Sequence, residues 1–476
     1  MKVLFAASEA LPFAASGGLA DVAGSLPAAL RRRVVGCRVV LPLYQDIPDN
    51  LRANMQFLGS LSVPVAWRRQ YCGVFEARVN GVIYYLLDNQ YYFKRPGLYG
   101  YYDDAERYAF FARAVLEMLP MLDFKPDVIH ANDWQSALIP IYFSLFYAKN
   151  EWYSSIKTLY TIHNIQYQGK YGMEILEDVF GIPQDQKNLV EYDGCINLMK
   201  GAIEAANAVN TVSPTYAEEL QDAWYAYGLH EIIRARKWKI SGILNGIDTE
   251  LYNPATDPEI YTHYDVNSFA TGKAENKAQL QARLGLEQRS GATMIGMVTR
   301  LTEQKGLDLV EYIADRLMRE HDVQVVLLGT GGWEYEAFFR ELQQKYPGRF
   351  CAYIGFVPEL SRKIYAASDI FLMPSKSEPC GLSQMIALRY GAVPVVRATG
   401  GLRDSVRDAG GENGNGFRFD TYNADDLYGA LNRALSLHQN QQEWNRLVER
   451  AMKSDNSWSR SAGDYLRLYR ELVPKQ

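Results

Sequence analysis

Short runs of consecutive apolar residues alternate along this chain with longer segments in which apolar residues recur every three or four positions. Residues 3–7 and 37–41 are runs typical of strands buried on both faces, and residues 22–30 between them have the spacing of a helix. Further strands are expected at 82–87, 127–130, 157–161 and 208–211, with helices such as 106–119 and 198–206 between them. This alternation predicts a doubly wound parallel α/β sheet.

The alternating pattern stops near residues 245–248, and residues 254–268 are polar and contain proline and aspartate. A helical segment at 273–284 follows, and a second alternating series then begins with a strand at 293–298. Its later members are helices at 306–319, 333–344 and 358–367 and strands at 323–328, 350–354, 370–373 and 393–397. We therefore expect two Rossmann-like sheets in separate domains, with a linker between them.

The stretch from residue 374 to residue 404 holds two candidate binding loops. The strand at 370–373 leads into a loop with Glu378 and Cys380-Gly381, and a helix is expected from Leu382. The strand at 393–397 leads into Thr399-Gly400-Gly401-Leu402. Loops at the carboxyl ends of neighbouring parallel strands form ligand pockets. The free amides of Gly381 and Leu382 at a helix start would attract anionic or hydroxylated ligands.

The pattern G-G-L-x-D occurs twice, at Gly17, Gly18 and Asp21 and again at 400–404. Paired glycines allow a ligand to approach the backbone closely, and an aspartate in the first helical turn suits the helix dipole. A tight strand-to-helix turn also needs glycine for structural reasons alone, so both interpretations stay open. Neither copy is G-x-G-x-x-G or a P-loop, and the pattern does not support a dinucleotide-binding or kinase site.

Two cations follow directly on the strand at 293–298. Arg300 and Lys305 lie at the carboxyl end of that strand, where a guanidinium and an ammonium could together grip a diphosphate. A solvated helix start is the alternative, although lysine is unfavourable there because of the helix dipole. Glu378 could bind sugar hydroxyls or stabilise positive charge at an anomeric carbon, and its alternative is a solvent-facing acid on a loop.

Three more polar residues follow strands of the first series. His163 closes one strand, Asp133 follows another, and Asn245 lies where the periodicity stops. Each stands where a ligand would reach it, at the carboxyl edge of the sheet. A lone histidine is often only packed in the core, and Asn245 could simply cap the turn before Gly246.

Composition restricts the classes of partner. The formal net charge of −5 over 476 residues gives no electrostatic basis for binding nucleic acid or an anionic membrane. The five cysteines are scattered without paired spacing, which predicts neither a disulfide framework nor a zinc site and favours a reducing cytoplasm. We identify neither a signal peptide nor a membrane-spanning run, and expect a cytoplasmic protein, or one of a plastid stroma if the source has plastids.

Seven motifs occur in order along the chain: S-E-A-L-P-F, S-G-G-L-A-D-V, Y-T-I-H-N, S-G-I-L-N-G-I-D, T-R-L-T-E-Q-K-G, P-S-K-S-E-P-C-G-L and T-G-G-L. As a collinear set they resemble the bacterial glycogen synthases and plant starch synthases, which are retaining glycosyltransferases of the GT-B architecture. The resemblance implies an α/β fold with two Rossmann-like domains facing across a cleft. These would be an acceptor-side domain at 1–248, completed by a crossover helix at 457–476, and a donor domain at 249–456.

The resemblance also implies an activity. Members of this family transfer glucose from a nucleotide sugar, usually ADP-glucose in bacteria, to the 4-hydroxyl at the non-reducing end of an α-1,4-glucan. The reaction retains the anomeric configuration and uses neither a metal nor a cofactor. The expected partners are therefore a nucleotide-sugar donor and an α-glucan acceptor, with no nucleic acid and no membrane.

Site residues carried over from the family fall into a catalytic and a binding set. Arg300 and Lys305 would neutralise the leaving diphosphate, Glu378 would lie in the donor-sugar site, and His163 and Asp133 would lie near the reacting centre. The binding set would contact the glucose and the nucleotide, and it includes the residues of the glycine loops. It comprises Gly17, Gly18, Asp21, Asn245, Phe356, Cys380, Gly381, Leu382, Thr399 and Gly400.

Two positions depart from the family pattern. Ala15 stands where family members have a lysine near the donor, and Asn132-Asp133-Trp134-Gln135 replaces H-D-W-H. One charged contact can contribute roughly 1.5–3 kcal/mol, so the loss of the lysine bears on donor affinity. The alternatives are a catalytically weak paralogue that binds glucan or nucleotide sugar, and a related GT-B transferase with another acceptor. A pyridoxal-dependent phosphorylase fits less well, because nothing singles out a Schiff-base lysine.

Overall fold

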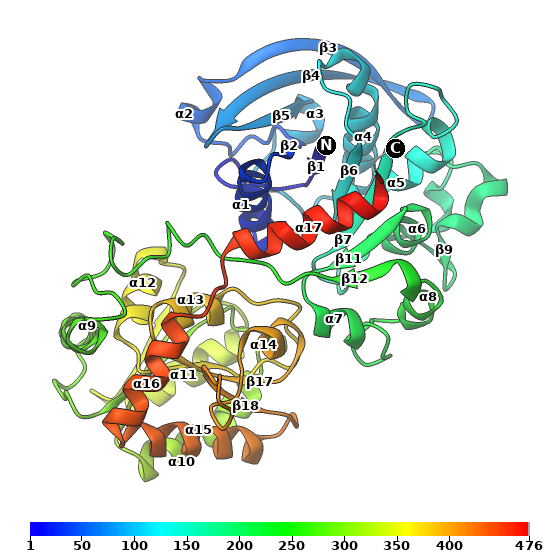
Figure 1. Ribbon diagram of the computed structural model, residues 1–476. Coiled ribbons are helices and arrows are strands. Elements are labelled where there is room, and N and C mark those ends of the chain that lie inside the picture. Colours follow the sequence, from blue (N-terminus) through cyan, green and yellow to red (C-terminus); the bar gives the residue numbers. More distant parts are fainter. Residues whose placement is uncertain (475–476) are drawn as a thin grey trace. The chain divides into compact units, whose positions relative to one another are not determined.

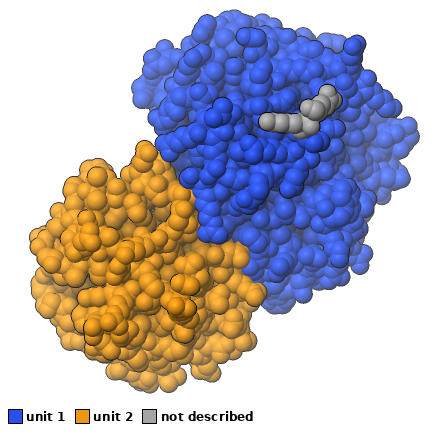
Figure 2. Space-filling model, in the orientation of Figure 1, with its two compact units in different colours: residues 1–246, 458–476 blue, residues 247–457 orange. Residues whose placement is uncertain are grey.

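The computed structural model describes residues 1–474, which form two compact units. Unit 1 comprises residues 1–246 with the C-terminal segment from residue 458, and unit 2 comprises residues 247–457 (Figures 1 and 2). Each unit has its own sheet and its own buried core. No helix within residues 1–474 is long and apolar enough to cross a membrane.

Unit 1 is built on a nine-stranded sheet with the order β12-β11-β7-β6-β1-β2-β5-β4-β3. On one side of β1 lie β2, β5, β4 and β3, and on the other side lie β6, β7, β11 and β12. The strand order therefore reverses between β1 and β6. The strands are β1 Lys2–Ala6, β2 Gly36–Pro42, β3 Gln56–Val65, β4 Arg68–Val79, β5 Val82–Asp88, β6 Val128–Asn132, β7 Lys157–Ile162, β11 Ala208–Thr211 and β12 Ile240–Gly242. A separate three-stranded sheet contains β8 Lys170–Tyr171, β9 Glu191–Tyr192 and β10 Cys195–Asn197.

The first sheet is parallel except at one edge, where β4 pairs antiparallel with both β5 and β3. The prediction of a wholly parallel sheet is therefore wrong for this edge. A two-residue link, Ala66-Trp67, joins β3 to β4, and such a hairpin needs no crossover helix. The remaining strands, including the fully buried Val3, Leu4 and Phe5 of β1, pair in parallel as the apolar runs predict.

Helices cover the sheet of unit 1. They are α1 Gly18–Arg32, α2 Asp49–Arg52, α3 Gln90–Phe93, α4 Asp104–Glu117, α5 Leu138–Tyr142, α6 Leu198–Ala205, α7 Pro214–Glu219, α8 His230–Ala235 and α17 Trp458–Leu472, with shorter helical turns η1–η6 at 119–121, 134–136, 143–147, 173–175, 184–189 and 237–239. The C-terminal helix α17 returns to this unit and packs beside α1 (Figure 1). Its Tyr469 hydroxyl lies 2.8 Å from Nδ1 of the buried His130 in β6.

Unit 2 contains a six-stranded parallel sheet with the order β15-β14-β13-β16-β17-β18. Numbered from β13 this is the order 3-2-1-4-5-6, which confirms the prediction of a Rossmann-like sheet. Its strands are β13 Thr293–Val298, β14 Val323–Gly329, β15 Phe350–Ile354, β16 Ile370–Met373, β17 Val393–Arg397 and β18 Phe417–Phe419. Its helices are α9 Phe269–Leu284, α10 Leu307–Glu320, α11 Trp333–Lys345, α12 Pro358–Ala367, α13 Ser383–Arg389, α14 Gly400–Ser405, α15 Ala424–His438 and α16 Gln441–Met452, with the turn η7 Glu303–Lys305.

Candidate functional site

In unit 2 the strand order reverses between β13 and β16, so the loops that follow these two strands lie beside each other at the carboxyl edge. Lys305 comes from the first loop and Glu378 from the second. The Nζ of Lys305 is 2.6 Å from Oε2 of Glu378, and the two side chains are only 14% and 10% exposed. Ser375 donates from Oγ to the same carboxylate oxygen at 3.2 Å. The structure thus brings the two residues together as a nearly buried ion pair.

A glycine allows these two loops to approach so closely. Gly306 has a φ of +70°, and a Cβ at this position would lie 2.0 Å from the carbonyl oxygen of Pro374. A side chain is therefore excluded both by the backbone conformation and by the neighbouring loop. Helix α10 begins at Leu307, one residue after the expected start at 306, and Lys305 ends the preceding turn η7.

The loops after β16 and β17 are also in backbone contact. Gly400 has a φ of +44°, and a Cβ there would lie 1.9 Å from the carbonyl oxygen of Glu378. The amide of Gly401 donates to that same oxygen at 3.1 Å. Thr399 and Cys380 are buried at this contact, whereas Gly381, with a φ of +72°, and Leu382 are half-buried. The predicted residues of both loops therefore form one continuous backbone surface.

The two G-G-L-x-D copies have different backbones. In unit 1, helix α1 begins at the second glycine, Gly18, and Asp21 lies in its first turn. In unit 2, α14 begins at the first glycine, Gly400, so Asp404 lies one position further along this six-residue helix and outside its first turn. The prediction of a first-turn aspartate is therefore correct for Asp21 and wrong for Asp404. The first glycines of the two copies also differ in conformation, since Gly400 is left-handed and Gly17 is extended with a φ of −165°.

Arg300 and Phe356 are two exposed residues that follow strands of the unit 2 sheet. Arg300 follows β13 and is exposed, and its side chain forms no hydrogen bond or ion pair with any residue from 1 to 474. Phe356 follows β15 and is 86% exposed. Because β15 and β13 flank β14, the two side chains belong to loops at the same carboxyl edge as Lys305. An exposed cation and an exposed aromatic ring at this edge remain available to a ligand.

In unit 1 the corresponding reversal lies between β1 and β6, and Asp133 directly follows β6. Its φ is +56°, which is unusual for a residue with a side chain. Its Oδ1 accepts hydrogen bonds from the backbone amides of His163 at 2.7 Å and Asn164 at 3.4 Å. The His163 Nε2 lies 2.9 Å from Oδ1 of Asn132. The structure therefore brings Asp133 and His163 together across neighbouring strands.

Burial shifts the pKa values of both groups in unit 1. Burial raises the pKa of Asp133 to about 7, against the two amide hydrogen bonds that favour its charged form. Burial lowers the pKa of His163 to about 3, so this imidazole is neutral near pH 7. A carboxyl group whose pKa lies near neutrality at the carboxyl edge of a sheet is typical of functional sites.

The loop after β1 contributes a carboxylate that the sequence analysis did not single out. Glu9 is buried and accepts a hydrogen bond from the amide of Ser16, next to Gly17. Burial raises the pKa of Glu9, and burial raises that of Asp21 in the first turn of α1 to about 6. Glu9 lies within the S-E-A-L-P-F motif. The signal that could have identified it in the sequence is a lone acid in a strand-to-helix loop.

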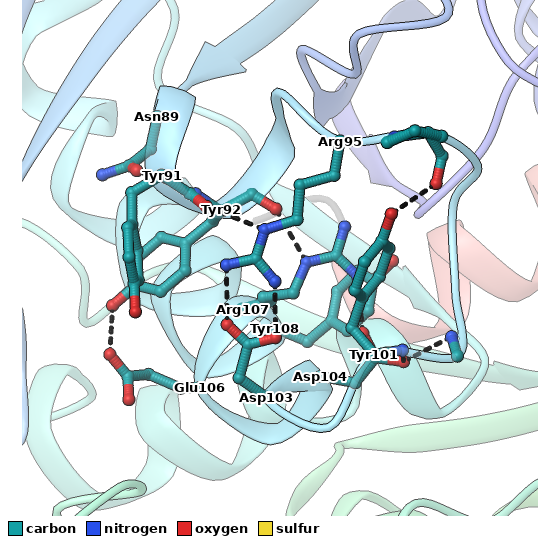
Figure 3. Close-up of polar contacts among 12 residues, drawn as sticks. Asn89, Tyr91, Tyr92, Arg95, Tyr101, Asp103, Asp104, Glu106, Arg107 and Tyr108 are labelled. Atoms are coloured by element: carbon teal, nitrogen blue, oxygen red, sulfur yellow. Dashed lines mark hydrogen bonds and ion pairs between the residues drawn. The ribbon is translucent and has the colours of Figure 1, made fainter.

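A tyrosine-rich loop at residues 94–103 reaches the same place. The Tyr99 hydroxyl is 2.7 Å from Oγ of Ser8, in the loop after β1. Figure 3 shows how the loop is held: Arg95 binds both carboxylate oxygens of Asp103 at 2.6 and 2.8 Å, and the buried Arg107 donates to the Tyr92 carbonyl at 2.8 Å. Since these contacts tie both ends of the loop, Tyr99 is held beside Glu9. No local sequence pattern could have predicted this, because Ser8 and Tyr99 are far apart in the chain.

Trp134, the residue after Asp133, lines an open cavity of about 350 Å³. Its lining includes the aromatic residues Trp134, Tyr167 and Tyr227 and the polar residues Gln166, Gln168 and Lys170. Aromatic rings with planar amides between them suit the apolar faces and hydroxyls of sugars. Asn245 follows β12 of the same sheet and is buried, and its Oδ1 has no hydrogen-bond partner within residues 1–474.

A metal site is not found in the part of the chain that the structure describes, because no three His, Cys, Asp or Glu side chains between residues 1 and 474 are grouped to hold an ion. The cysteines are free, and burial raises the pKa of the Cys37 and Cys72 thiols to about 12.

Comparison with known proteins covers the whole chain. The family model of the starch synthase catalytic domain matches residues 2–235, and that of glycosyl transferases group 1 matches residues 282–453. The glycogen synthase of Geobacillus thermodenitrificans (strain NG80-2) is 50% identical over 480 residues, covering 100% of this chain and 99% of the relative. The glycogen synthase of Clostridioides difficile (strain 630) is 46% identical over 481 residues, covering 99% and 100%.

A solved structure is also similar over its full length. The catalytic domain of starch synthase IV from Arabidopsis thaliana, bound to ADP and acarbose, has a TM-score of 0.91 and 35% sequence identity. The match covers 100% of this chain and 99% of that one. Fold and sequence therefore agree on the same group of proteins.

Proposed function

The chain belongs to the family of glycogen and starch synthases, and on that premise we propose that it transfers glucose from ADP-glucose to the non-reducing end of an α-1,4-glucan. The observation that carries the proposal is the Lys305–Glu378 ion pair at the carboxyl edge of the unit 2 sheet, where open α/β sheets bind ligands. The ADP bound to the similar Arabidopsis starch synthase supports ADP as the nucleotide.

The donor half of the reaction rests on the two cations after β13. In the proposed step the bond from the anomeric carbon to the β-phosphate oxygen breaks, and ADP leaves with the electron pair. Lys305 and the exposed Arg300 would offset the negative charge that develops on the diphosphate, Lys305 as a point charge and Arg300 as a bidentate donor. Phe356 offers an exposed ring on which a nucleobase could stack.

The glucose itself would lie against the turn after β16. Glu378 has a second carboxylate oxygen beyond the one bound by Lys305 and Ser375, and it can accept hydrogen bonds from sugar hydroxyls. The backbone of Cys380, Gly381 and Leu382, with the neighbouring Thr399 and Gly400, would complete the glucose contacts. A carboxylate here would also stabilise the positive charge that develops at the anomeric carbon.

We assign the acceptor half to unit 1. The glucan 4-hydroxyl forms the new bond to the anomeric carbon on the face that ADP leaves, which gives retention. Its proton passes to the departing phosphate. Asp133, His163 and Asn245 would orient the reacting sugar, and Asp21 with the Gly17-Gly18 turn would line the donor side. The aromatic cavity lined by Trp134 would hold the next glucose residues of the acceptor. No step requires a metal or a cofactor.

A transfer assay with two donors tests the proposal. Purified protein is incubated with glycogen and either ADP-glucose or UDP-glucose, and glucose incorporation and product linkage are measured. We expect transfer from ADP-glucose into α-1,4 linkages, and a loss of orders of magnitude in Glu378→Ala. Binding without turnover with either donor would instead favour the catalytically weak paralogue. The motivation for that alternative is Ala15 in place of the family lysine. A product with another acceptor would favour the related transferase.

A further inference from the structure

Gln384 is a fully buried residue that joins the two glycine turns of unit 2. It is the second residue of α13, and its Nε2 donates to the carbonyl oxygens of Cys380 at 3.0 Å and Gly381 at 2.9 Å and to Ser405 Oγ at 3.0 Å. Ser405, at the end of α14, in turn donates from Oγ to the Gly401 carbonyl at 2.6 Å. A single side-chain amide therefore connects the turn after β16 to the turn after β17.

The contacts fix which way the amide points. If its oxygen and nitrogen were exchanged, the oxygen would face two carbonyl oxygens, which accept hydrogen bonds but cannot donate them. The Oε1 is therefore directed away from them, and it is buried with no hydrogen-bond partner in residues 1–474. It lies 2.5 Å from the place that a Cβ would take at Gly381. A buried acceptor without a partner weakens the fold, so its presence beside a ligand-binding turn points to a functional reason.

The held carbonyls determine where the neighbouring amides point. Each peptide group is planar and trans, so its N–H is directed opposite to its C=O. Holding the Cys380 and Gly381 carbonyls against Gln384 therefore aims the N–H groups of Gly381 and Leu382 the other way. Neither of these amides donates to any residue between 1 and 474, and both residues are half-buried, so both N–H groups remain open to a ligand.

We propose that Gln384 is a positioning residue for the donor glucose: it holds the Gly381 turn so that two backbone N–H groups face the sugar. The inference rests on the proposed function, which places glucose at this turn and the diphosphate at Lys305 and Arg300. Because Gln384 contacts neither cation, its loss should weaken interactions with glucose and leave those with ADP unchanged.

The test compares Gln384→Met with a matched control, Gln281→Met. Gln281 lies in α9 and is also buried. Its Nε2 donates to the Arg289 carbonyl at 3.0 Å and to Gln324 Oε1 in β14 at 2.7 Å, so it contacts neither turn. For each full-length variant, kcat/KM for ADP-glucose, the Kd values of ADP and ADP-glucose, and Tm are measured. We expect Gln384→Met to lower kcat/KM at least tenfold and to change the Kd of ADP less than twofold. Gln281→Met should lower Tm with kcat/KM within twofold of wild type.

Two outcomes would overturn the inference: wild-type kcat/KM in Gln384→Met, or equal losses for ADP and ADP-glucose. If Gln384→Met does not fold, Ser405→Ala removes one acceptor of the same amide, and it should weaken ADP-glucose severalfold and leave ADP unchanged; equal effects on the two would refute the proposal. Wild-type protein that binds ADP-glucose without transfer would refute only the proposed function, because the comparison of Kd values still tests Gln384. Absence of ADP-glucose binding to wild type would overturn both.

Discussion

Replacing Lys305 by alanine separates a structural role of the buried ion pair from a role in the reaction. The Lys305 ammonium lies 2.6 Å from Glu378, and both side chains are largely buried. Alanine removes the cation and leaves the Glu378 carboxylate with only Ser375 as a side-chain hydrogen-bond donor among the described residues. Two separate losses follow, one in the free energy of unfolding and one in the free energy of the transition state.

The two losses have different sizes. Removing one partner of a buried ion pair typically lowers the free energy of unfolding by about 3–5 kcal/mol. A hydrogen bond from a cation to a phosphate contributes about 1.5–3 kcal/mol. Since each 1.36 kcal/mol is a factor of ten in rate, losing that contact should lower kcat by about 13- to 160-fold. The effect should appear in kcat more than in KM, because the charge on the diphosphate grows as ADP leaves.

The assay needs a control with the same buried chemistry elsewhere. Lys277 and Asp369 form such a pair, with 2.5 Å between Nζ and Oδ2 and with side chains 8% and 12% exposed, at the amino edge of the same sheet. Lys277→Ala should therefore destabilise the protein to a similar extent in urea unfolding, with kcat per folded molecule close to wild type. If Lys305→Ala loses stability but keeps kcat within threefold, Lys305 is only structural and its assignment to the diphosphate is refuted.

The other predictions concern unit 1 and the glycine turns. Ala15→Lys should lower the apparent KM for ADP-glucose about tenfold in initial-rate measurements, and no change would mean that another cation has replaced the lysine. Gly400→Ala should fail to fold because its Cβ would lie 1.9 Å from the Glu378 carbonyl oxygen, whereas Gly18→Ala should keep its free energy of unfolding within about 0.5 kcal/mol, as thermal melts would test. The pKa of His163 is lowered to about 3, so the unfolded chain takes up its proton first and stability falls as the pH drops below about 6.5. In urea unfolding, His163→Gln should remove up to about 1.4 kcal/mol of this loss per pH unit. Equal dependence of the free energy of unfolding on pH in variant and wild type would show that the folded protein already binds the proton.

The strands and their order follow closely from the sequence where burial is two-sided. The run at 293–298 matches β13 Thr293–Val298, and the run at 370–373 matches β16 Ile370–Met373. Parallel central strands need apolar residues on both faces, so the pattern is strong and its ends are sharp. From this pattern the position of Lys305 and Glu378 at the sheet edge could be predicted. Their 2.6 Å contact could not, since it depends on the close approach of two loops at Gly306.

The residues that sequence reasoning missed act through contacts between distant segments. Hairpin β3–β4 lies at an edge of the sheet, where one-sided burial weakens the apolar pattern. Gln384 reads as an ordinary helical residue, and only the backbone of the turn shows which carbonyls its amide holds. Tyr99 and Ser8 meet because the ends of a loop are tied by Arg95 and Asp103. In each case the signal is tertiary, and one sequence alone does not contain it.

The two glycine pairs show how the structure separates the two interpretations of one motif. At Gly400 a side chain would collide with the Glu378 carbonyl and the backbone is left-handed, so the fold itself requires glycine there. At Gly18 no atom lies within 4 Å of an added Cβ, and Gly17 is extended with only a Glu9 oxygen near, at 3.9 Å. Neither turn chemistry nor packing requires glycine at these two positions. Backbone contact therefore explains the glycine of the second copy, and the close approach of a ligand stays the prediction for the first.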